Sequence, residues 1–228
     1  MSKLNLLRSV SPFSRLDYEE LKLLVDGLGM QSFKRGETIF FQGSSGNMLY
    51  IIVSGQVRIY TLSEMGQELS MTIFRAGDFF GELSLLDERP RSASAQAMLP
   101  TRTLTLDRDE FLHMVTVCPA MTVAVLETLA TRLRSSTVYA EQLASYSAGQ
   151  RIVQQLLTLA AYSARPGQST TSKELHITQD DLASLSGTTR ETVNRVLSNL
   201  RDRGLVQVDR ARIRILNPDE LERSLIEW

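Results

Sequence analysis

The most informative part of this chain is Thr188-Thr189-Arg190-Glu191-Thr192-Val193-Asn194-Arg195-Val196-Leu197, because its spacing predicts a short helix with two different faces. Apolar residues recur at helical spacing on one face, which can be buried. The opposite face is polar. Arginine can donate two hydrogen bonds to guanine and glutamate can accept one from cytosine, so this face predicts base contacts in a DNA groove. The polar side chains are Arg190, Glu191, Asn194, Arg195 and Ser198.

The residues before this helix favour the same interpretation. Thr178 suits the N-cap of a helix that extends to Leu185, and Ser186–Thr188 supply a glycine-containing turn. Two short helices joined by such a turn are typical of a helix-turn-helix. The alternative is structural: Thr188 and Glu191 would form a capping box, and the arginines would be ordinary solvated side chains.

A wing is predicted after the second helix. Gly204 suits a helix C-cap, and residues 205–215 alternate apolar and polar side chains as two short strands would, turning near Asp209–Ala211. Its arginines either contact phosphate or simply face solvent; they are Arg210, Arg212 and Arg214. The residues predicted to contact DNA are Thr178, Thr189, Arg190, Glu191, Asn194, Arg195 and Arg212.

The N-terminal half has a different pattern. A short helix is predicted near Tyr18–Leu28, and residues 33–106 hold short apolar runs separated by glycines. This spacing predicts an antiparallel sandwich or barrel. The runs are Thr38–Phe41, Leu49–Val53, Val57–Tyr60, Ser70–Phe74 and Ala95–Ala97.

One segment of this half suggests a ligand. Gly81 precedes a short helical turn, where backbone N–H groups can approach an anion closely. Arg91 offers a forked donor suited to phosphate, Ser92 a hydroxyl, and Glu82 an acceptor for a ribose hydroxyl. Together they predict a pocket for a ribose-phosphate ligand. The alternative is that Arg91 and Glu82 pair with each other inside the barrel.

A long helix is predicted between the two halves. Pro119 suits its first turn, and the pattern continues to about Ser145. Apolar and small residues alternate at spacings of three and four, which is typical of the seam of a two-stranded coiled coil and predicts a homodimer. The alternative is that this face packs against the chain's own β-domain. The seam comprises Leu126, Leu129, Leu133, Ser136, Ala140 and Leu143.

Composition excludes several classes of protein. The chain has 228 residues and a net charge of -1, so DNA affinity has to come from local placement of arginines. Its one cysteine, Cys118, excludes an internal disulfide and makes an iron–sulfur cluster or Cys-rich zinc site unsupported. His113 and His176 form no metal-ligand pattern, and no catalytic motif is present. Without a long apolar run or signal sequence, we expect no membrane association and a cytoplasmic location.

The Gly81–Ala93 cassette and the Arg190–Arg195 segment together resemble the cyclic-AMP receptor protein and fumarate-nitrate regulator family of bacterial transcription factors. The similarity covers nearly the whole chain in the family's order. It implies an α+β fold with a cyclic-nucleotide-binding β-roll (jelly roll) over residues 1–118, a dimerisation helix over residues 119–146, and a winged helix-turn-helix over residues 147–228.

The resemblance also implies roles for particular residues. In the family, the residues matched by Arg91 and Ser92 bind the cyclic phosphate, and the one matched by Glu82 binds the ribose 2′-hydroxyl. Those matched by Arg190, Glu191 and Arg195 read a TGTGA-type half-site, arranged as an inverted repeat in double-stranded DNA. The implied ligand-binding set is Gly81, Glu82, Leu83, Arg91, Ser92, Arg132, Ser136 and Thr137, and the implied dimer contacts are Leu126, Leu129, Leu133, Ala140 and Leu143.

Cyclic AMP is the effector that the resemblance favours. The loop Asp87–Pro90 is about one residue shorter than in the cyclic-AMP receptor, which leaves cyclic GMP, cyclic di-GMP, another metabolite or no effector open. The oxygen-sensing branch of the family needs a cluster of cysteines, which Cys118 alone cannot provide. The carbon-monoxide branch needs haem ligands, for which His113 and His176 are misplaced. RNA polymerase is an implied partner, near the loop Ala164–Lys173. Less favoured are an enzyme and a cyclic-nucleotide module of residues 1–146 that acts on a protein partner.

Overall fold

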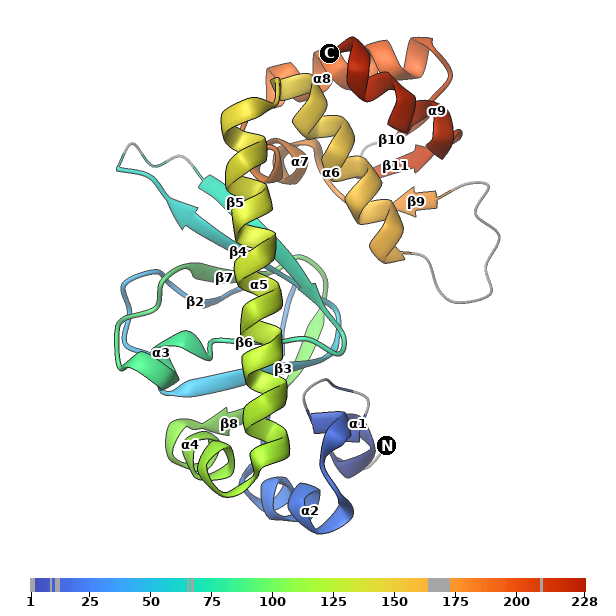
Figure 1. The fold of residues 1–228 in the computed structure, drawn as a ribbon. Helices are drawn as coiled ribbons and strands as arrows, with labels where there is room; N and C mark the ends of the chain where they lie inside the picture. The colour runs from blue at the N-terminus through green and yellow to red at the C-terminus, as the bar shows by residue number, and fades with distance from the viewer. Residues whose placement is uncertain are drawn as a thin grey trace. The chain divides into compact units, whose positions relative to one another are not determined.

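A computed structural model describes residues 3–8, 10, 13–64, 66, 68–163, 173–209 and 211–228 (Figure 1). The chain forms two compact units, Met1–Ser136 and Thr137–Trp228, called unit 1 and unit 2 here. The division falls within helix α5, Pro119–Ser145. The three-part division at residues 118 and 146 stays a prediction. Arg210 and residues 164–172 of the predicted polymerase loop lie outside the described residues.

Unit 1 is built around two four-stranded antiparallel sheets, with strand orders β1-β8-β3-β6 and β2-β7-β4-β5. The strands are β1 Gly29–Phe33, β2 Thr38–Phe40, β3 Met48–Ser54, β4 Gln56–Leu62, β5 Glu68–Arg75, β6 Phe79–Phe80, β7 Ser94–Ala97 and β8 Thr101–Asp107. The helices are α1 Lys3–Arg8, α2 Tyr18–Gly27, α3 Leu83–Asp87 and α4 Arg108–Val117, with a 3-10 turn at Phe13–Arg15. The predicted β-roll is confirmed.

Strand β3 shows how the sequence supplies two cores. Successive side chains of a strand point to opposite faces. Leu49 and Ile51 therefore join the core that packs under α1, α2, α4 and α5. Tyr50 and Ile52 point the other way, into a second core that contains Val57 of the facing sheet. The second core fills the interior of the roll, where the ligand pocket is predicted.

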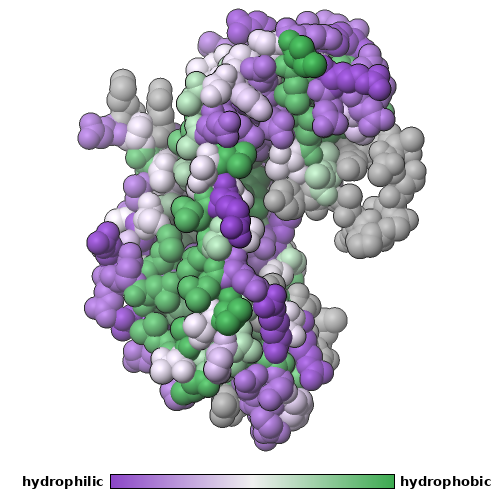
Figure 2. Space-filling view, in the orientation of Figure 1, coloured by the Kyte–Doolittle hydropathy of each residue, from purple (hydrophilic) through white to green (hydrophobic). Residues whose placement is uncertain are grey.

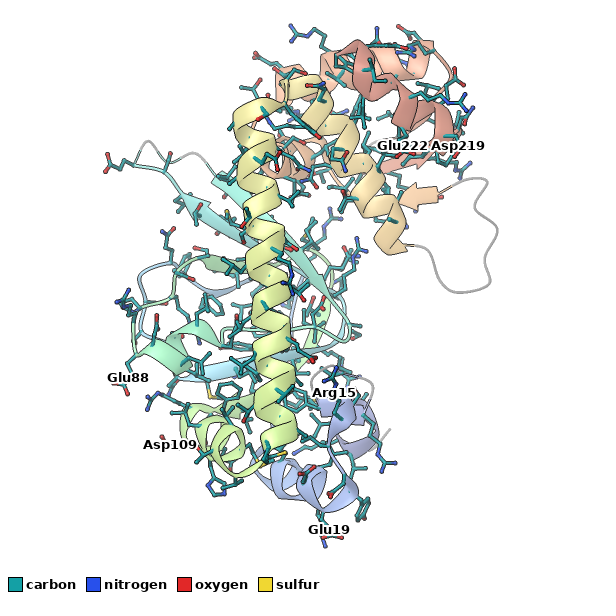
Figure 3. All side chains as sticks on the ribbon, in the orientation of Figure 1. Arg15, Glu19, Glu88, Asp109, Asp219 and Glu222 are labelled. Carbon is teal, nitrogen blue, oxygen red and sulfur yellow. The ribbon has the colours of Figure 1, made fainter. Side chains whose placement is uncertain are left out.

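Helix α5 begins in unit 1, as the sequence predicts. Pro119 is its first residue, and the buried side chains of Met121, Ala124 and Val125 fix its first turns against the helical core. On another side, Glu127 forms a 2.7 Å ion pair with Arg15, whose position is labelled in Figure 3. The N-terminal part of α5 is thus attached to the same core as β3.

Unit 2 contains helices α6 Ala148–Ser163, α7 Gln179–Leu185, α8 Arg190–Asp202 and α9 Pro218–Arg223, followed by a 3-10 turn at Ser224–Glu227. Its sheet has the order β10-β11-β9, from Val206–Asp209, Arg212–Ile215 and Lys173–Leu175. Helix α6 packs against α8 and α9. Trp228 lies on Gly149 of α6, where an added Cβ would be 2.5 Å from the indole. The predicted winged helix-turn-helix is confirmed.

No single helix in the described part of the chain combines the length and apolar character of a membrane span. The pair α4 and α5 passes that test only together, with a bend of 109° between them. The described residues also contain no group of three or more His, Cys, Asp or Glu side chains placed to hold a metal ion.

Candidate functional site

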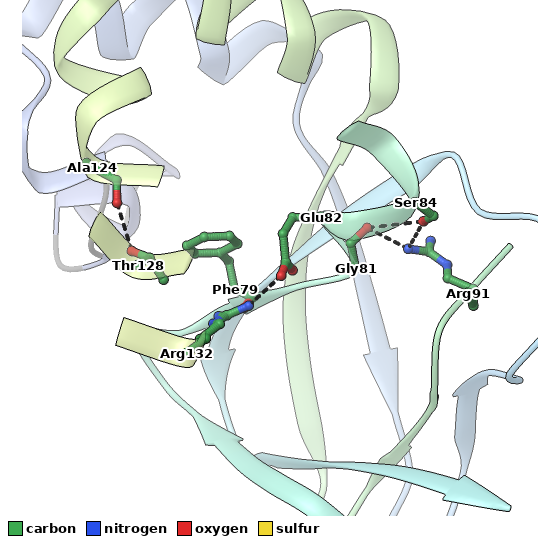
Figure 4. Close-up of polar contacts among 8 residues, drawn as sticks. All are labelled: Phe79, Gly81, Glu82, Ser84, Arg91, Ala124, Thr128 and Arg132. Atoms are coloured by element: carbon green, nitrogen blue, oxygen red, sulfur yellow. Dashed lines mark hydrogen bonds and ion pairs between the residues drawn. The ribbon is translucent and has the colours of Figure 1, made fainter. Parts of the chain in front are cut away.

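Arg91 is the buried centre of the predicted pocket, and its side chain is 5% exposed. Its Nη1 donates hydrogen bonds to Gly81 O at 2.6 Å and to Ser84 Oγ at 2.9 Å (Figure 4). Its Nη2 donates to Met48 O at 2.8 Å. The guanidinium also lies 4.2 Å from the centre of the Phe40 ring. These partners hold the planar group in one orientation inside the roll.

The environment of Arg91 favours a bound anion. Burial lowers the pKa of its guanidinium, although Tyr50 and Glu82 act in the opposite direction. Its described hydrogen-bond partners are two carbonyl oxygens and a hydroxyl, all uncharged, and among the described residues its buried Nε has none. A buried cation with neutral partners is costly, so an anion at this site would be stabilised.

Gly81 allows this arrangement because it has no side chain. Its φ is +86°, a left-handed conformation that residues with a Cβ rarely adopt. A Cβ at this position would lie 2.7 Å from Arg91 Nη1 and 3.0 Å from Met48 O. The glycine therefore lets the backbone before α3 approach both the guanidinium and β3.

Glu82 pairs with Arg132 of α5 rather than with Arg91. Its carboxylate is 4% exposed and accepts a hydrogen bond from Arg132 Nη1 at 2.8 Å (Figure 4). Arg132 also donates to Phe79 O, and its guanidinium lies 4.3 Å and 4.7 Å from the ring centres of Phe74 and Phe79. The structural alternative of an Arg91–Glu82 pair is therefore wrong. The contact connects the cassette to the long helix.

The remaining predicted ligand residues lie on the surface. Leu83 is 47% exposed, and Ser92 is also exposed. Ser136 and Thr137, one turn beyond Arg132 on α5, are exposed as well. The structure thus brings together Gly81, Glu82, Arg91 and Arg132, while the ligand roles of all eight residues stay predictions.

An open depression of about 640 Å³ lies beside the cassette. Its lining includes Ser84, which holds Arg91, and Arg108, which pairs with Glu88 and donates to Leu85 O. Glu82 and Arg132 are not among its lining residues. Sequence reasoning missed Arg108, which stands in no recognisable motif, and it assigned no contact to Ser84, although Ser84 lies within the cassette. The full lining is Gly43, Ser45, Gly46, Asn47, Ser84, Glu88, Arg89, Pro90 and Arg108.

Helix α8 has the two faces that its spacing predicts. Val193, Val196, Leu197 and Leu200 are buried, whereas the predicted DNA-contacting side chains of the helix are exposed. Arg190 lies 3.4 Å from an Asp180 carboxylate oxygen of α7. The exposed set is Arg190, Glu191, Asn194 and Arg195.

The caps of both helices are well defined. Thr178 forms a capping box with Asp181 at the start of α7, as predicted for an N-cap. Thr189 caps α8 by accepting a hydrogen bond from the Thr192 N–H at 3.3 Å. The alternative that Thr188 is the cap is therefore wrong, and Glu191 is not at the capping-box position. At the other end, Gly204 has a φ of +72° and closes the helix in a Schellman motif.

Arg151 of α6, which sequence reasoning missed, holds the turn between α7 and α8. Its guanidinium donates to Ser186 O at 2.7 Å, Gly187 O at 3.1 Å and Tyr146 O at 2.7 Å. The Tyr139 hydroxyl donates to Leu185 O at 3.3 Å. The carbonyl end of α7 is thereby tied to the last turns of α5 within unit 2. An isolated arginine in a helical segment gives no sequence signal for such a role.

Glu174 of β9 is a further residue that the sequence did not reveal, the second of them in unit 2. Its Oε1 lies 3.3 Å from Arg212 Nη1, and its Oε2 accepts a hydrogen bond from Arg214 Nη2 at 3.1 Å. The hydrogen bond from Arg214, with the charge of Arg212, holds the pKa of the Glu174 carboxyl below its ordinary value. Of the three predicted wing arginines, the two in the described part of the chain, Arg212 and Arg214, are therefore engaged by one carboxylate.

The predicted seam of α5 leaves large apolar side chains in solvent. Leu126 is 60% exposed and Leu133 70%. Ala140 is exposed, whereas Leu129 and Leu143 are partly buried. Figure 2 shows hydrophobic surface gathered along and beside the part of α5 that belongs to unit 1. Contiguous exposed apolar side chains on one helix are typical of an interface.

Known proteins match both units. The model of a cyclic nucleotide-binding domain matches residues 30–117, and that of a Crp-like helix-turn-helix domain matches residues 150–224. A cyclic AMP receptor protein of Thermus thermophilus is 35% identical over 196 residues, which are 86% of this chain and 88% of the relative. A CRP-like cAMP-activated global transcriptional regulator of Mycobacterium tuberculosis is 32% identical over 211 residues, 92% of this chain and 94% of the relative.

A solved structure supports the fold as well. The c-di-GMP responsive global regulator CLP of Xanthomonas campestris has a TM-score of 0.77 at 22% identity, over 88% of this chain and 100% of that one. At this identity the likeness shows the fold alone. The two relatives and the matched domains show that the chain belongs to the cyclic-AMP receptor protein and fumarate-nitrate regulator (CRP/FNR) family, as a DNA-binding transcription regulator with a cyclic-nucleotide-binding domain.

Proposed function

We propose that this chain acts as a homodimer that binds a TGTGA-type inverted repeat and is gated by a cyclic nucleotide, with cyclic AMP as the favoured effector. The names of the relatives from Thermus thermophilus and Mycobacterium tuberculosis support the choice of cyclic AMP. RNA polymerase is the proposed protein partner on promoter DNA.

The observation that carries this proposal is the buried Arg91 guanidinium with uncharged partners. A cyclic phosphate is an anion that such a group can bind through charge-assisted hydrogen bonds. Glu82 lies at the start of the same cassette, and its carboxylate can accept from a ribose hydroxyl in exchange for part of its contact with Arg132. Phosphate and ribose would then be recognised by neighbouring buried charges of opposite sign.

Arg132 connects the proposed ligand site to helix α5. It contacts Glu82 and belongs to α5, so a nucleotide that changes the Glu82–Arg132 contact also changes how α5 is held in unit 1. Ser136 and Thr137, on the next turn, are proposed to contact the purine. A ligand shifts this equilibrium only as far as it binds the two arrangements with different affinity.

The exposed face of α8 is proposed to read the half-site. Arg190 and Arg195 suit guanine, and Glu191 suits cytosine. One short helix contacts few base pairs, whereas a two-fold dimer presents two such helices about 34 Å apart. The exposed apolar seam of α5, with Leu126 at its start, is the proposed dimer contact.

Isothermal titration of cyclic AMP into the nucleotide-stripped protein tests the proposal. Wild type is expected to bind with a roughly micromolar Kd, about -8 kcal/mol, and Arg91→Ala to show no binding. Arg89→Ala is the matched control, because Arg89 is exposed two residues away. Circular dichroism checks that Arg91→Ala is folded, and Arg91→Lys serves as a second variant that retains the charge.

Unchanged binding by folded Arg91→Ala would contradict the role of Arg91. If wild type binds no cyclic AMP, the same titration with cyclic GMP and cyclic di-GMP distinguishes another nucleotide effector from none. The assignment of residues 150–224 as a DNA-binding domain does not depend on the outcome of these titrations.

A further inference from the structure

The exposed side of the wing is organised around one carboxylate. Strand β9 pairs with β11 so that Glu174 is directly opposite Arg214. Side chains on β11 alternate: Ile213 and Ile215 are buried, whereas Arg212 and Arg214 are exposed on the same face. Each oxygen of the Glu174 carboxylate faces one guanidinium, and His176 Nε2 lies 3.8 Å from Oε1.

This arrangement resembles the way in which arginines hold a phosphate. Two guanidiniums that converge on two oxygens of one anion are well placed for charge-assisted hydrogen bonds to the DNA backbone. In the structure the anion is the chain's own Glu174. The Glu174 carboxylate engages one nitrogen of each guanidinium, so a DNA phosphate that approaches Arg212 and Arg214 meets arginines already paired with an anion.

The net charge of Arg212, Arg214 and Glu174 is more important for DNA binding than their ion pairs are for the stability of the fold. The side chains of Arg212, Arg214 and Glu174 are 62%, 47% and 32% exposed, and ion pairs at such exposure contribute little to stability. Glu174 does lower the net charge of the two arginines from +2 to +1. Its carboxylate is 3.3 Å from Arg212 and 3.1 Å from Arg214, so a phosphate in contact with either arginine would lie at a distance comparable to the Debye length of about 8 Å, where salt screens the interaction only in part.

We propose that Glu174 is a specificity-determining residue of the DNA-binding unit. Its carboxylate masks Arg212 and Arg214, weakens sequence-independent attraction to the phosphate backbone, and leaves discrimination between sites to the base-reading face of α8. The proposal rests on the proposed contact between the wing and DNA. Phosphate contacts carry affinity but little sequence information, so masking them raises the ratio of specific to non-specific binding.

Glu174→Gln tests this idea, because it removes the charge and keeps the size of the side chain. Fluorescence anisotropy would measure binding to a duplex with the TGTGA-type inverted repeat and to a scrambled duplex of equal length, at several salt concentrations. We expect Glu174→Gln to bind the scrambled duplex several-fold more tightly and the inverted repeat by a smaller factor. The slope of log K against log salt on the scrambled duplex is expected to steepen by about 0.9 for each added phosphate contact.

Two control variants separate the possible failures. Glu222→Gln removes an equal charge from α9, at the position labelled in Figure 3, and is expected to leave the specificity ratio unchanged. The double variant Arg212→Gln/Arg214→Gln is expected to weaken scrambled-duplex binding. If the double variant weakens binding but Glu174→Gln leaves it unchanged or weaker, masking by Glu174 is wrong. If the double variant has no effect, the wing does not contact DNA, and the proposal fails together with that part of the proposed function.

Discussion

At the scale of single residues, the pocket depends on a glycine as much as on its charges. Gly36 and Gly81 both have positive φ values, +83° and +86°. A Cβ at Gly36 would meet nothing within 4 Å, whereas one at Gly81 would lie against Arg91 and Met48. The two positions have nearly the same φ, so a side chain would be strained at either one, and they differ in the space around them.

Gly81→Ala is therefore expected to be more damaging than Gly36→Ala. Both changes place an alanine in the left-handed region, at a cost of about 1–2 kcal/mol. At Gly81 the overlap with Arg91 and Met48 adds about 1–3 kcal/mol. Urea denaturation measures the difference, and titration of cyclic AMP is expected to show weaker binding for Gly81→Ala alone. Equal destabilisation by the two changes would mean that the close approach at Gly81 has no energetic weight.

The sequence predicted the charged residues of the site but not their partners. Glu82 and Arg91 stand in a recognisable cassette, so their presence could be predicted. Arg91 is held by Met48 O, 43 positions away in the chain, and Glu82 by Arg132, 50 positions away. Contacts between such distant residues follow from closure of the roll and docking of α5, which local spacing does not encode.

At the scale of helices and strands, elements with clear periodicity were predictable and the others were not. Helix α8 combines buried apolar and exposed polar residues at helical spacing, and α5 begins at Pro119 as predicted. Adjacent hydroxyls at Thr188 and Thr189 made the cap of α8 ambiguous, since either can cap a helix. Strand β1 is almost entirely exposed, and β8 buries threonines as well as leucines, so neither contains the apolar run by which the other strands were identified.

The exposed seam of α5 leads to a prediction about assembly. Leu126→Asp places a charge at an exposed position, so the monomer is expected to stay folded while the dimer dissociates. Sedimentation equilibrium measures the mass. Losing the second half-site contact is expected to weaken binding to the inverted repeat by about 10²–10⁴-fold.

Thr131→Asp is the matched control for this change, because Thr131 is exposed on α5 outside the predicted seam. It is expected to leave both the mass and the DNA affinity unchanged. A Leu126→Asp protein that remains dimeric would show that the seam does not form the dimer.

For the molecule as a whole, the buried cassette and helix α8, which are proposed to bind the effector and to read bases, belong to different units of the chain. If a cyclic nucleotide favours the arrangement that binds DNA, linkage requires that DNA favours the nucleotide by the same factor. In the proposed dimer such coupling would depend on both units and could not be assigned to one residue.

Reciprocal titrations test this coupling. Saturating cyclic AMP is expected to raise the affinity for the inverted repeat by about 5–150-fold, and saturating duplex to raise the affinity for cyclic AMP by an equal factor. Anisotropy measures the first quantity and calorimetry the second. Unequal factors would show that one titration includes another process, and a factor of one in both would exclude gating by cyclic AMP.

Trp228 has an optical consequence. It is the chain's one tryptophan, and its indole packs on Gly149 of α6 within unit 2. Its side chain is partly enclosed, and among the described residues the buried indole N–H has no hydrogen-bond acceptor. The tryptophan emission of the unmodified protein therefore reports on the helix-turn-helix unit alone. A thermal melting curve followed by tryptophan emission therefore records the unfolding of unit 2. It needs no added label and contains no tryptophan signal from the β-roll of unit 1.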